Sequence, residues 1–136
     1  MPTTSWVSTP VLPVRERLLI LPIIGVLDRE RARQLTVQLL GGIRTHRAKV
    51  VVVDITGVPD VDESVANHLV RTVDASRLMG ASVIITGLSP EIAQTLVTIG
   101  VDLSKMNTIG DLQGGLEEAE RLLGYSVSRE DGNGGP

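Results

Sequence analysis

Residues 50–64 read VVVVDITGVPDVDES, and this stretch decides the fold class. Its four consecutive valines are too few to span a membrane and too apolar for an exposed strand, so they predict a strand buried on both faces that ends at Asp54. Gly57 and Pro59 predict a turn after it. Asp62 then offers the side-chain acceptor that a helix start needs, and apolar residues follow at helical spacing. A core strand that leads into a helix in this way indicates an open α/β sheet, where function tends to lie beyond the carboxyl ends of the strands.

The composition excludes several classes of function. The chain has 136 residues, of which 42% are hydrophobic, enough for one domain with a real core. Aromatic residues make up only 1% and the net charge is −3, which argues against a nucleic-acid surface. There is no cysteine, so disulfides, thiol nucleophiles and cysteine zinc sites are excluded. With no signal-peptide pattern and no apolar run of about 20 residues, we expect a soluble, cytoplasmic protein.

The segments before the central strand predict two strands and a helix. Residues 11–15 and 17–24 are strand-like, and their prolines indicate that at least one strand lies at a sheet edge or ends early. Asp28 begins a helix with one apolar face. Because Gly41 and Gly42 are unfavourable inside a helix, this helix either ends there or continues weakly to about residue 47.

The segments after the central strand continue the alternation. The second helix ends near residues 79–80, and residues 81–86 form a strand. Ser89 and Pro90 begin a helix, residues 105–109 form a short strand, and Asp111 begins a last helix. The order predicts parallel strands with right-handed crossovers and an antiparallel edge, hence a small mixed sheet of four to five strands. We expect residues 9–124 to form the domain, residues 1–8 a linker or disordered segment, and residues 125–136 a disordered tail.

Hydrolytic chemistry finds little support. His68 follows Ser64 by four residues, so the two could share a helix face and resemble part of a catalytic triad. No nucleophile elbow or oxyanion arrangement accompanies them. The acidic residues near Asp62 suit a helix start without any metal ion, and no phosphate-binding loop is present.

One constellation resembles a phospho-accepting receiver domain. Asp54 and Thr86 end successive strands, and Lys105 lies just before the last strand. Such a site also needs two acidic residues after the first strand to hold magnesium, and here that region, which reads RLLILPIIG from Arg17, has no acidic residue until Asp28. A turn or capping role for Asp54 is therefore the favoured interpretation.

Three hydroxyl groups near helix starts are the remaining candidates. Ser64 lies in the first turn after the central strand, Ser89 caps the next helix, and Thr95 borders the buried stripe of that helix. Each also has an ordinary structural role, as solvated helix start, cap and border residue, and physics alone favours these roles. A phosphate at Ser64 would be tolerated by the helix dipole, so its effect would fall on whatever docks at that edge.

A family resemblance adds to these inferences. The segments DITGVPDVDESVA and RLMGASVIITGLSPEIAQTLVTIGVDL resemble the STAS domain family of anti-sigma-factor antagonists. Within it the chain looks most like the stressosome proteins RsbR and RsbS, and GLSPEIAQTLVTIG is closest to the RsbR type. STPVLPVRERLLILPIIGVLDRERARQL is similar to the start of an RsbR STAS domain. The resemblance covers residues 9–123 and implies a STAS fold, with a small mixed sheet and helices packed mainly on one face.

The resemblance also implies a function without catalysis, metal or cofactor. RsbR and RsbS proteins assemble into a cytoplasmic signalling shell, the stressosome, which holds a switch kinase, RsbT, that phosphorylates STAS domains. The implied partners are therefore sibling STAS proteins and an RsbT-type kinase, with a homodimer and a larger assembly. A single-partner antagonist like SpoIIAA remains an alternative, as does, less favoured, the receiver-like domain. RsbR proteins usually carry a sensory domain before the STAS domain, and an excised domain and a stand-alone, RsbS-like protein are both open.

The family's phosphosites map onto this chain unequally. The second site, in PEIAQT, maps onto Thr95. The first directly follows the Asp that corresponds to Asp62, where this chain has Glu63 instead of a hydroxyl residue. Glu63 is then a natural fixed charge, an engineered mimic of a phosphate, or a bystander whose role Ser64 has taken, although a shift by one residue rotates the side chain about 100° around the helix. The first two explanations are favoured.

The same mapping predicts a docking edge for partners. It consists of Asp62, Glu63, Ser64, Ser89 and Glu91.

Overall fold

The computed structural model describes residues 11–124. Its strands are β1 (Leu12–Arg15), β2 (Leu18–Ile24), β3 (Val50–Gly57), β4 (Ser82–Thr86) and β5 (Thr108–Ile109). Its helices are α1 (Arg29–His46), α2 (Glu63–Leu78), α3 (Pro90–Thr98) and α4 (Leu112–Leu123), with a 3₁₀-helix, η2 (Leu103–Lys105), between α3 and β5. The predicted order of strands and helices is confirmed, and η2 is an addition to it.

The five strands form one sheet in the order β1-β2-β3-β4-β5. β1 pairs antiparallel with β2, and all other pairs are parallel. This mixed sheet with an antiparallel edge confirms the predicted α/β fold class. The edge strand β1 contains Pro13, as the proline argument requires. Pro22 lies in the part of β2 beyond the residues that pair with β1, so it interrupts no ladder there.

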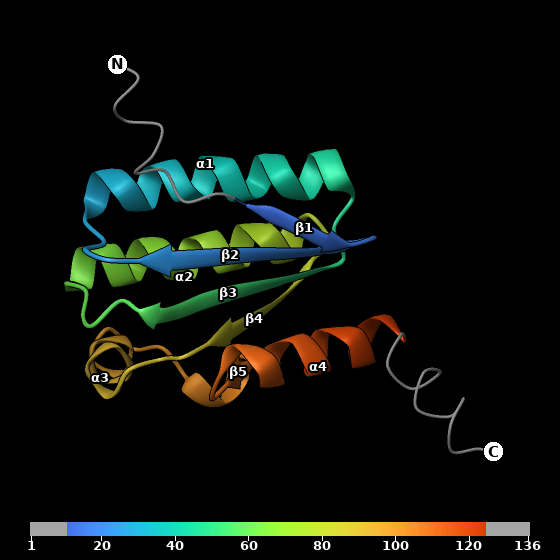
Figure 1. The fold of residues 1–136 in the computed structure, drawn as a ribbon. Coiled ribbons are helices and arrows are strands. Elements are labelled where there is room, and N and C mark those ends of the chain that lie inside the picture. Colours follow the sequence, from blue (N-terminus) through green and yellow to red (C-terminus); the bar gives the residue numbers. More distant parts are fainter. Residues whose placement is uncertain (1–10, 125–136) are drawn as a thin grey trace.

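The helices cover the two faces of the sheet unequally (Figure 1). Alternate residues of the valine run face opposite ways, because side chains alternate along a strand. Val51 and Val53 join the larger core with α1, α2 and α3. Val50 and Val52 join a smaller core with α4, where Ala119 is buried. Three helices on one face and one on the other confirm the expectation of helices mainly on one face.

One local prediction needs correction. β3 continues to Gly57 instead of ending at Asp54, because Ile55 is still buried in the larger core. Of the two lengths expected for the first helix, the longer one is confirmed. α1 runs through Gly41 and Gly42 to His46, because Leu39 and Ile43 on its buried face continue the packing past the glycines.

Close contact between α4 and the sheet depends on one glycine. A Cβ at Gly115 would overlap the Cγ2 atom of Thr86, which is fully buried at the end of β4. Glycine in a helix interior costs about 1 kcal/mol relative to alanine. The absence of a side chain at Gly115 therefore allows α4 to pack closely against β4, which offsets the cost of glycine in the helix.

Candidate interaction site

Three helices begin at the same edge of the sheet, where β2, β3 and β4 end (Figure 1). Each start has a side-chain cap. Asp28 accepts a hydrogen bond from the Arg31 N–H over 2.8 Å, Asp62 from the Val65 N–H over 2.8 Å, and Ser89 from the Ile92 N–H over 3.1 Å. The predicted caps are confirmed. They leave the first turns of α1, α2 and α3 facing the same side of the molecule, which we call the carboxyl edge.

The loop before α2 holds its acidic residues in fixed positions, because buried residues lie next to them in the sequence. Val61 and Val65 are buried on either side of Asp62, so the capping residue is held between two core anchors. Asp60 Oδ1 accepts a hydrogen bond from the Val61 N–H over 2.8 Å. Glu63 and Ser64 follow and are exposed on the first turn of α2, as predicted. An acidic residue in that turn is favoured by the helix dipole.

The start of α3 is attached to this loop. Ser89 Oγ donates a hydrogen bond to the main-chain oxygen of Pro59 over 3.0 Å while it caps its own helix. Glu91 is exposed in the first turn of α3. One turn later, half-buried Thr95 donates its hydroxyl to the Glu91 carbonyl over 3.1 Å. The structure thus places all the residues of the predicted docking edge on two neighbouring, connected helix starts.

Sequence reasoning missed an apolar part of the same edge. Ile24, the last residue of β2, and Val26, two residues later in the β2–α1 connection, are 71% and 80% exposed. The signal was present in the sequence, because two β-branched aliphatic residues flank Gly25 where the strand passes into a connection and polar residues are usual. An apolar centre beside charged residues is the composition of many protein interfaces.

The receiver-like constellation is only partly assembled. Asp54 Oδ1 accepts hydrogen bonds from Thr86 Oγ1 over 2.6 Å and from Thr56 Oγ1 over 3.0 Å. Both donors therefore occupy one carboxylate oxygen at the end of the strands, which agrees with a structural role for Asp54. Lys105 is exposed in η2 and forms no ion pair within residues 11–124.

The suggested Ser64–His68 pair does not form. His68 Nε2 instead lies 2.9 Å from Thr36 Oγ1, and Thr36 Oγ1 lies 2.6 Å from Thr72 Oγ1. This polar cluster joins α1 to α2. Within the described part of the chain, no group of three metal-ligating side chains comes together.

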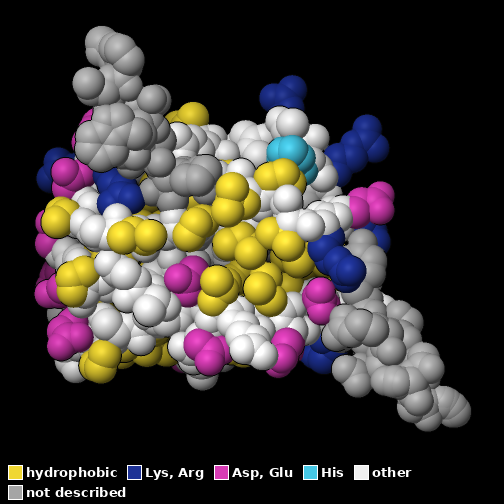
Figure 2. Space-filling model, viewed as in Figure 1, with side chains coloured by type: hydrophobic (Ala, Val, Ile, Leu, Met, Phe, Trp, Pro, Cys, Tyr) yellow, Lys and Arg dark blue, Asp and Glu magenta, His cyan; other side chains and the backbone are white. Residues whose placement is uncertain are grey.

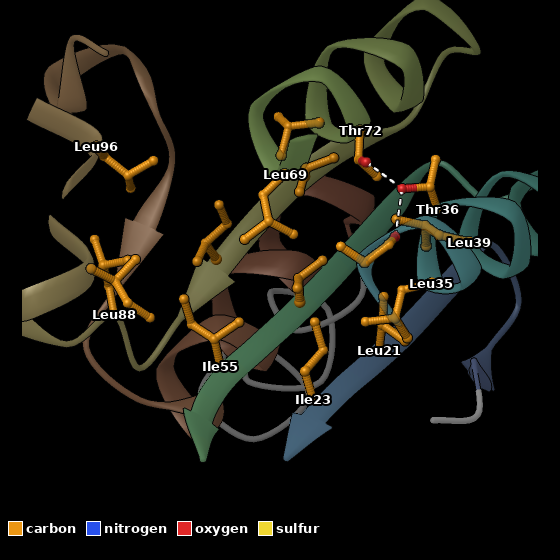
Figure 3. Close-up of a pocket in the computed structure, with 16 residues that line it drawn as sticks. Leu21, Ile23, Leu35, Thr36, Leu39, Ile55, Leu69, Thr72, Leu88 and Leu96 are labelled. Atoms are coloured by element: carbon orange, nitrogen blue, oxygen red, sulfur yellow. Dashed lines mark hydrogen bonds between the residues drawn. The ribbon is translucent and has the colours of Figure 1, made fainter. Parts of the chain in front are cut away.

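An internal cavity lies between the sheet and these helices (Figure 3). Its volume is about 50 Å³, and aliphatic side chains from β2, β3, β4 and all three covering helices line it, with Thr36 and Thr72 as its polar residues. Leu88 and Leu96 reach it from the α3 side. α3, the helix that carries Thr95, therefore packs over this cavity.

Two ion pairs are ordinary surface pairs within a helix: Arg121 with Glu118 in α4, and Arg33 with Glu30 at the start of α1. The Arg121 guanidinium donates to Glu118 over 2.9 and 2.6 Å, and this hydrogen bonding lowers the pKa of the Glu118 carboxyl. Glu30 raises the pKa of Arg33 in the same way. None of the helices within residues 11–124 has the length and apolar character needed to cross a membrane.

Comparison with known proteins identifies the family of this chain. A family model described as the STAS domain matches residues 9–113. The RsbT co-antagonist protein RsbRA of Bacillus subtilis is 45% identical over 120 residues, covering 88% of this chain and 44% of that protein. RsbRD of the same organism is 38% identical over 101 residues, covering 74% and 36%. The chain spans less than half the length of these curated relatives.

Solved structures give the same result. A serine-to-glutamate variant of RsbS from Moorella thermoacetica superimposes with a TM-score of 0.75 at 32% identity, covering 85% of this chain and 97% of that one. A chain of the structure described as the molecular architecture of the stressosome gives 0.69 at 28% identity, covering 84% and 98%. SpoIIAA in its unphosphorylated form, at 14% identity, TM-score 0.68 and coverage of 86% and 97%, shares the fold. With a matching family model, a mixed five-stranded sheet and RsbR-type relatives, this chain belongs to the STAS domain family.

Proposed function

We propose that this domain is a non-catalytic, phosphorylation-regulated scaffold of a stress-signalling assembly of the stressosome type. It binds sibling STAS domains and a serine/threonine switch kinase of the RsbT type. The names of the relatives support this proposal, since RsbRA and RsbRD are RsbT co-antagonists and another similar chain comes from a stressosome. The observation that carries it is the Ser89–Pro59 hydrogen bond, which joins the cap of α3, the helix that holds Thr95, to the loop before α2, the helix that begins at Glu63.

Thr95 is the proposed phosphate acceptor. Its hydroxyl is bonded only to a carbonyl of its own helix, so it can turn outward without breaking a contact between helices. A phosphate adds about −1.5 to −2 charge. That charge joins Glu91, Asp62 and Glu63 at the carboxyl edge and changes which partner surfaces the edge attracts.

Glu63 is proposed as a fixed negative charge at the first switch position. It occupies the first position of α2, where its single charge is favoured by the helix dipole and points into solvent. The domain would then carry a permanent negative charge at the first phosphosite position, and only the charge at Thr95 would change with phosphorylation. Ser64 is exposed beside it and is the competing acceptor.

Site-resolved phosphate mapping tests the proposal. The domain is incubated with an RsbT-type kinase, ATP and magnesium, alongside the variants Thr95→Ala, Ser64→Ala and Asp54→Asn. We expect phosphate on Thr95 in the original chain, in Ser64→Ala and in Asp54→Asn, and none in Thr95→Ala. Unchanged phosphate uptake by Thr95→Ala would refute the assignment. Phosphate that is released by hydroxylamine and absent from Asp54→Asn would instead support a receiver-like domain.

Particle mass tests the scaffold role separately. Mixed with sibling RsbR- and RsbS-type proteins, the domain should enter particles far larger than a hetero-oligomer of a few chains. A small complex with one kinase alone would favour the single-partner antagonist, whose fold the chain shares.

A further inference from the structure

The carboxyl edge holds an exposed apolar projection that is unusually well fixed. Ile24 and Val26 expose most of their side chains although both are large and aliphatic. Single exposed aliphatic residues are common, but two that flank one glycine at the end of a strand form a local apolar feature. We call residues 24–26 the knob.

An arginine holds the knob in place. Arg31 Nη1, from the first turns of α1, donates hydrogen bonds to the Ile24 carbonyl over 2.5 Å and to the Val26 carbonyl over 2.9 Å. The Gly25 N–H donates to the Gly57 carbonyl over 3.1 Å, and Leu27 is buried directly after the knob. Gly25 has φ +90°, a conformation that suits glycine. The two aliphatic side chains are therefore presented on a backbone that is already ordered.

Acidic side chains gather at the edge that carries the knob, beside Arg29, Arg31 and Arg33 of α1. Asp28, Asp60, Asp62 and Glu63 lie at the same edge and are exposed. Within residues 11–124 none of the four forms an ion pair. Figure 2 shows Asp and Glu side chains gathered along this edge, with some Arg side chains of α1 among them. A partner for the knob therefore needs an apolar recess with basic groups beside it.

The opposite end of the same domain has a groove with an exposed aliphatic residue and a basic residue. Its volume is about 400 Å³, and it lies between the end of α2, the start of β4 and Leu122 of α4. Leu122 supplies its exposed apolar surface, Arg77 its charge, and Ser82 and Asn107 further polar lining. β5 pairs only with Ile85 and Thr86 of β4, so no strand of the described chain covers the groove. Its volume falls within the roughly 300–1,000 Å³ of sites that hold small molecules.

Basic residues gather at that end. Arg77 is in the last turn of α2, and four others are exposed near the β1–β2 turn and the α1–β3 connection: Arg17, Arg44 in the last turn of α1, Arg47 and Lys49. None of these five cations forms an ion pair within the described residues. Arg17 and Arg47 have φ of +70° and +51°, where non-glycine residues are uncommon. Arg47 is the C-cap of α1 and Arg17 lies in the turn between β1 and β2, so both conformations belong to chain reversals that place arginine at this end.

We propose that the knob of one copy inserts into the Arg77 groove of a second copy, so that neighbouring domains associate head to tail. The contact pairs the apolar knob with exposed Leu122 in the groove, and an edge rich in acidic groups with an end rich in basic groups. It uses different surfaces on the two copies, so each domain can continue the chain of contacts. The proposal rests on the proposed scaffold function and identifies the surfaces through which siblings meet.

Sedimentation equilibrium over a range of protein concentrations tests the contact. The weight-average mass of the original domain should rise with concentration and rise less at high salt, because exposed charges are screened. The variants Ile24→Ser/Val26→Ser and Arg77→Glu should each lose about tenfold or more in the association constant. Val37→Ser is the matched control, since Val37 is 69% exposed on α1 outside both surfaces, and it should associate like the original domain.

Mixing the two defective variants makes the test decisive. Ile24→Ser/Val26→Ser keeps its groove and Arg77→Glu keeps its knob, so an equimolar mixture should form a 1:1 complex that does not grow further. Association curves of the variants that match the original, or a mixture that behaves as the average of its components, would overturn the proposal. Phosphate transfer to Thr95 needs neither surface of a second copy, so this failure would leave the kinase-substrate function standing.

Discussion

Ser89 Oγ donates a hydrogen bond to the carbonyl oxygen of Pro59 over 3.0 Å, and the same oxygen atom accepts one from the Ile92 N–H over 3.1 Å. One hydroxyl group therefore caps α3 and attaches it to the loop before α2. The two helix starts that we propose as switch elements cannot separate without breaking this bond. A change of charge at one start is in this way coupled to the position of the other.

Substitutions at Ser89 should separate its two roles. Ser89→Ala removes the cap and the attachment and should destabilise the domain by about 1–2 kcal/mol. Ser89→Asp can still cap α3 but has no proton for the Pro59 carbonyl, so it should cost less. Urea unfolding measures both, and amide hydrogen exchange in the first turn of α2 should increase in each. Thr98→Ala, whose hydroxyl bonds only its own helix, is the control. Equal exchange in Ser89→Asp and the original domain would contradict the coupling.

Gly115 should be intolerant of a side chain. Gly115→Ala places a methyl group against the Thr86 Cγ2 atom and should lower the free energy of unfolding by about 1–3 kcal/mol. Thr86→Ser removes that methyl group and keeps the hydroxyl that bonds Asp54, so the double variant should recover part of the loss. Gly41→Ala, with open space around the new atom, should stabilise the domain by about 0.5–1 kcal/mol. A double variant less stable than Gly115→Ala alone would show that another contact is responsible.

Thr36 should contribute more stability than its half-buried position indicates. Its Oγ1 atom contacts the Ala32 carbonyl over 3.0 Å, His68 Nε2 and Thr72 Oγ1, and so joins α1 to α2 beside the cavity (Figure 3). Thr36→Val keeps the shape and removes the shared oxygen, which should cost about 1–2 kcal/mol. Thermal unfolding of this variant, of Thr72→Val and of the double variant would measure the coupling. Strict additivity of the two losses would show that the two hydroxyls act independently.

Local features of the fold were predictable from the sequence. The caps at Asp28, Asp62, Ser89 and Asp111 are predictable because each bonds an N–H three residues away. The valine run likewise identified the central strand. The end of that strand was misplaced, because the burial of Ile55 depends on helices that are distant in the sequence.

Long-range features of the site were not predictable. The Ser89–Pro59 bond joins residues 30 positions apart, and nothing in either residue type signals the pairing. The hold of Arg31 on the knob depends on the direction in which α1 leaves the sheet. The mapped residues Glu63 and Thr95 were placed by family resemblance, and the structure adds that their helices begin side by side.

The role of Glu63 gives the last prediction. If Glu63 occupies a switch position as a fixed charge, Glu63→Thr should restore an acceptor there. An RsbT-type kinase should then add a second phosphate, at position 63, to a chain that otherwise takes one on Thr95. Intact-mass and site-resolved mass spectrometry would count and locate the phosphates. Glu63→Gln is the control, because it removes the charge and supplies no hydroxyl.

The stability of these variants provides an independent check. Glu63 lies in the first turn of α2, where an acidic side chain contributes about 0.3–1 kcal/mol through the helix dipole, so both variants should lose a similar small amount that salt reduces. Phosphorylation at position 63 should return that charge and more, because a phosphate carries up to about two negative charges. A kinase that phosphorylates Thr95 but leaves position 63 unmodified in Glu63→Thr would show that the edge around Glu63 is not recognised as a switch site.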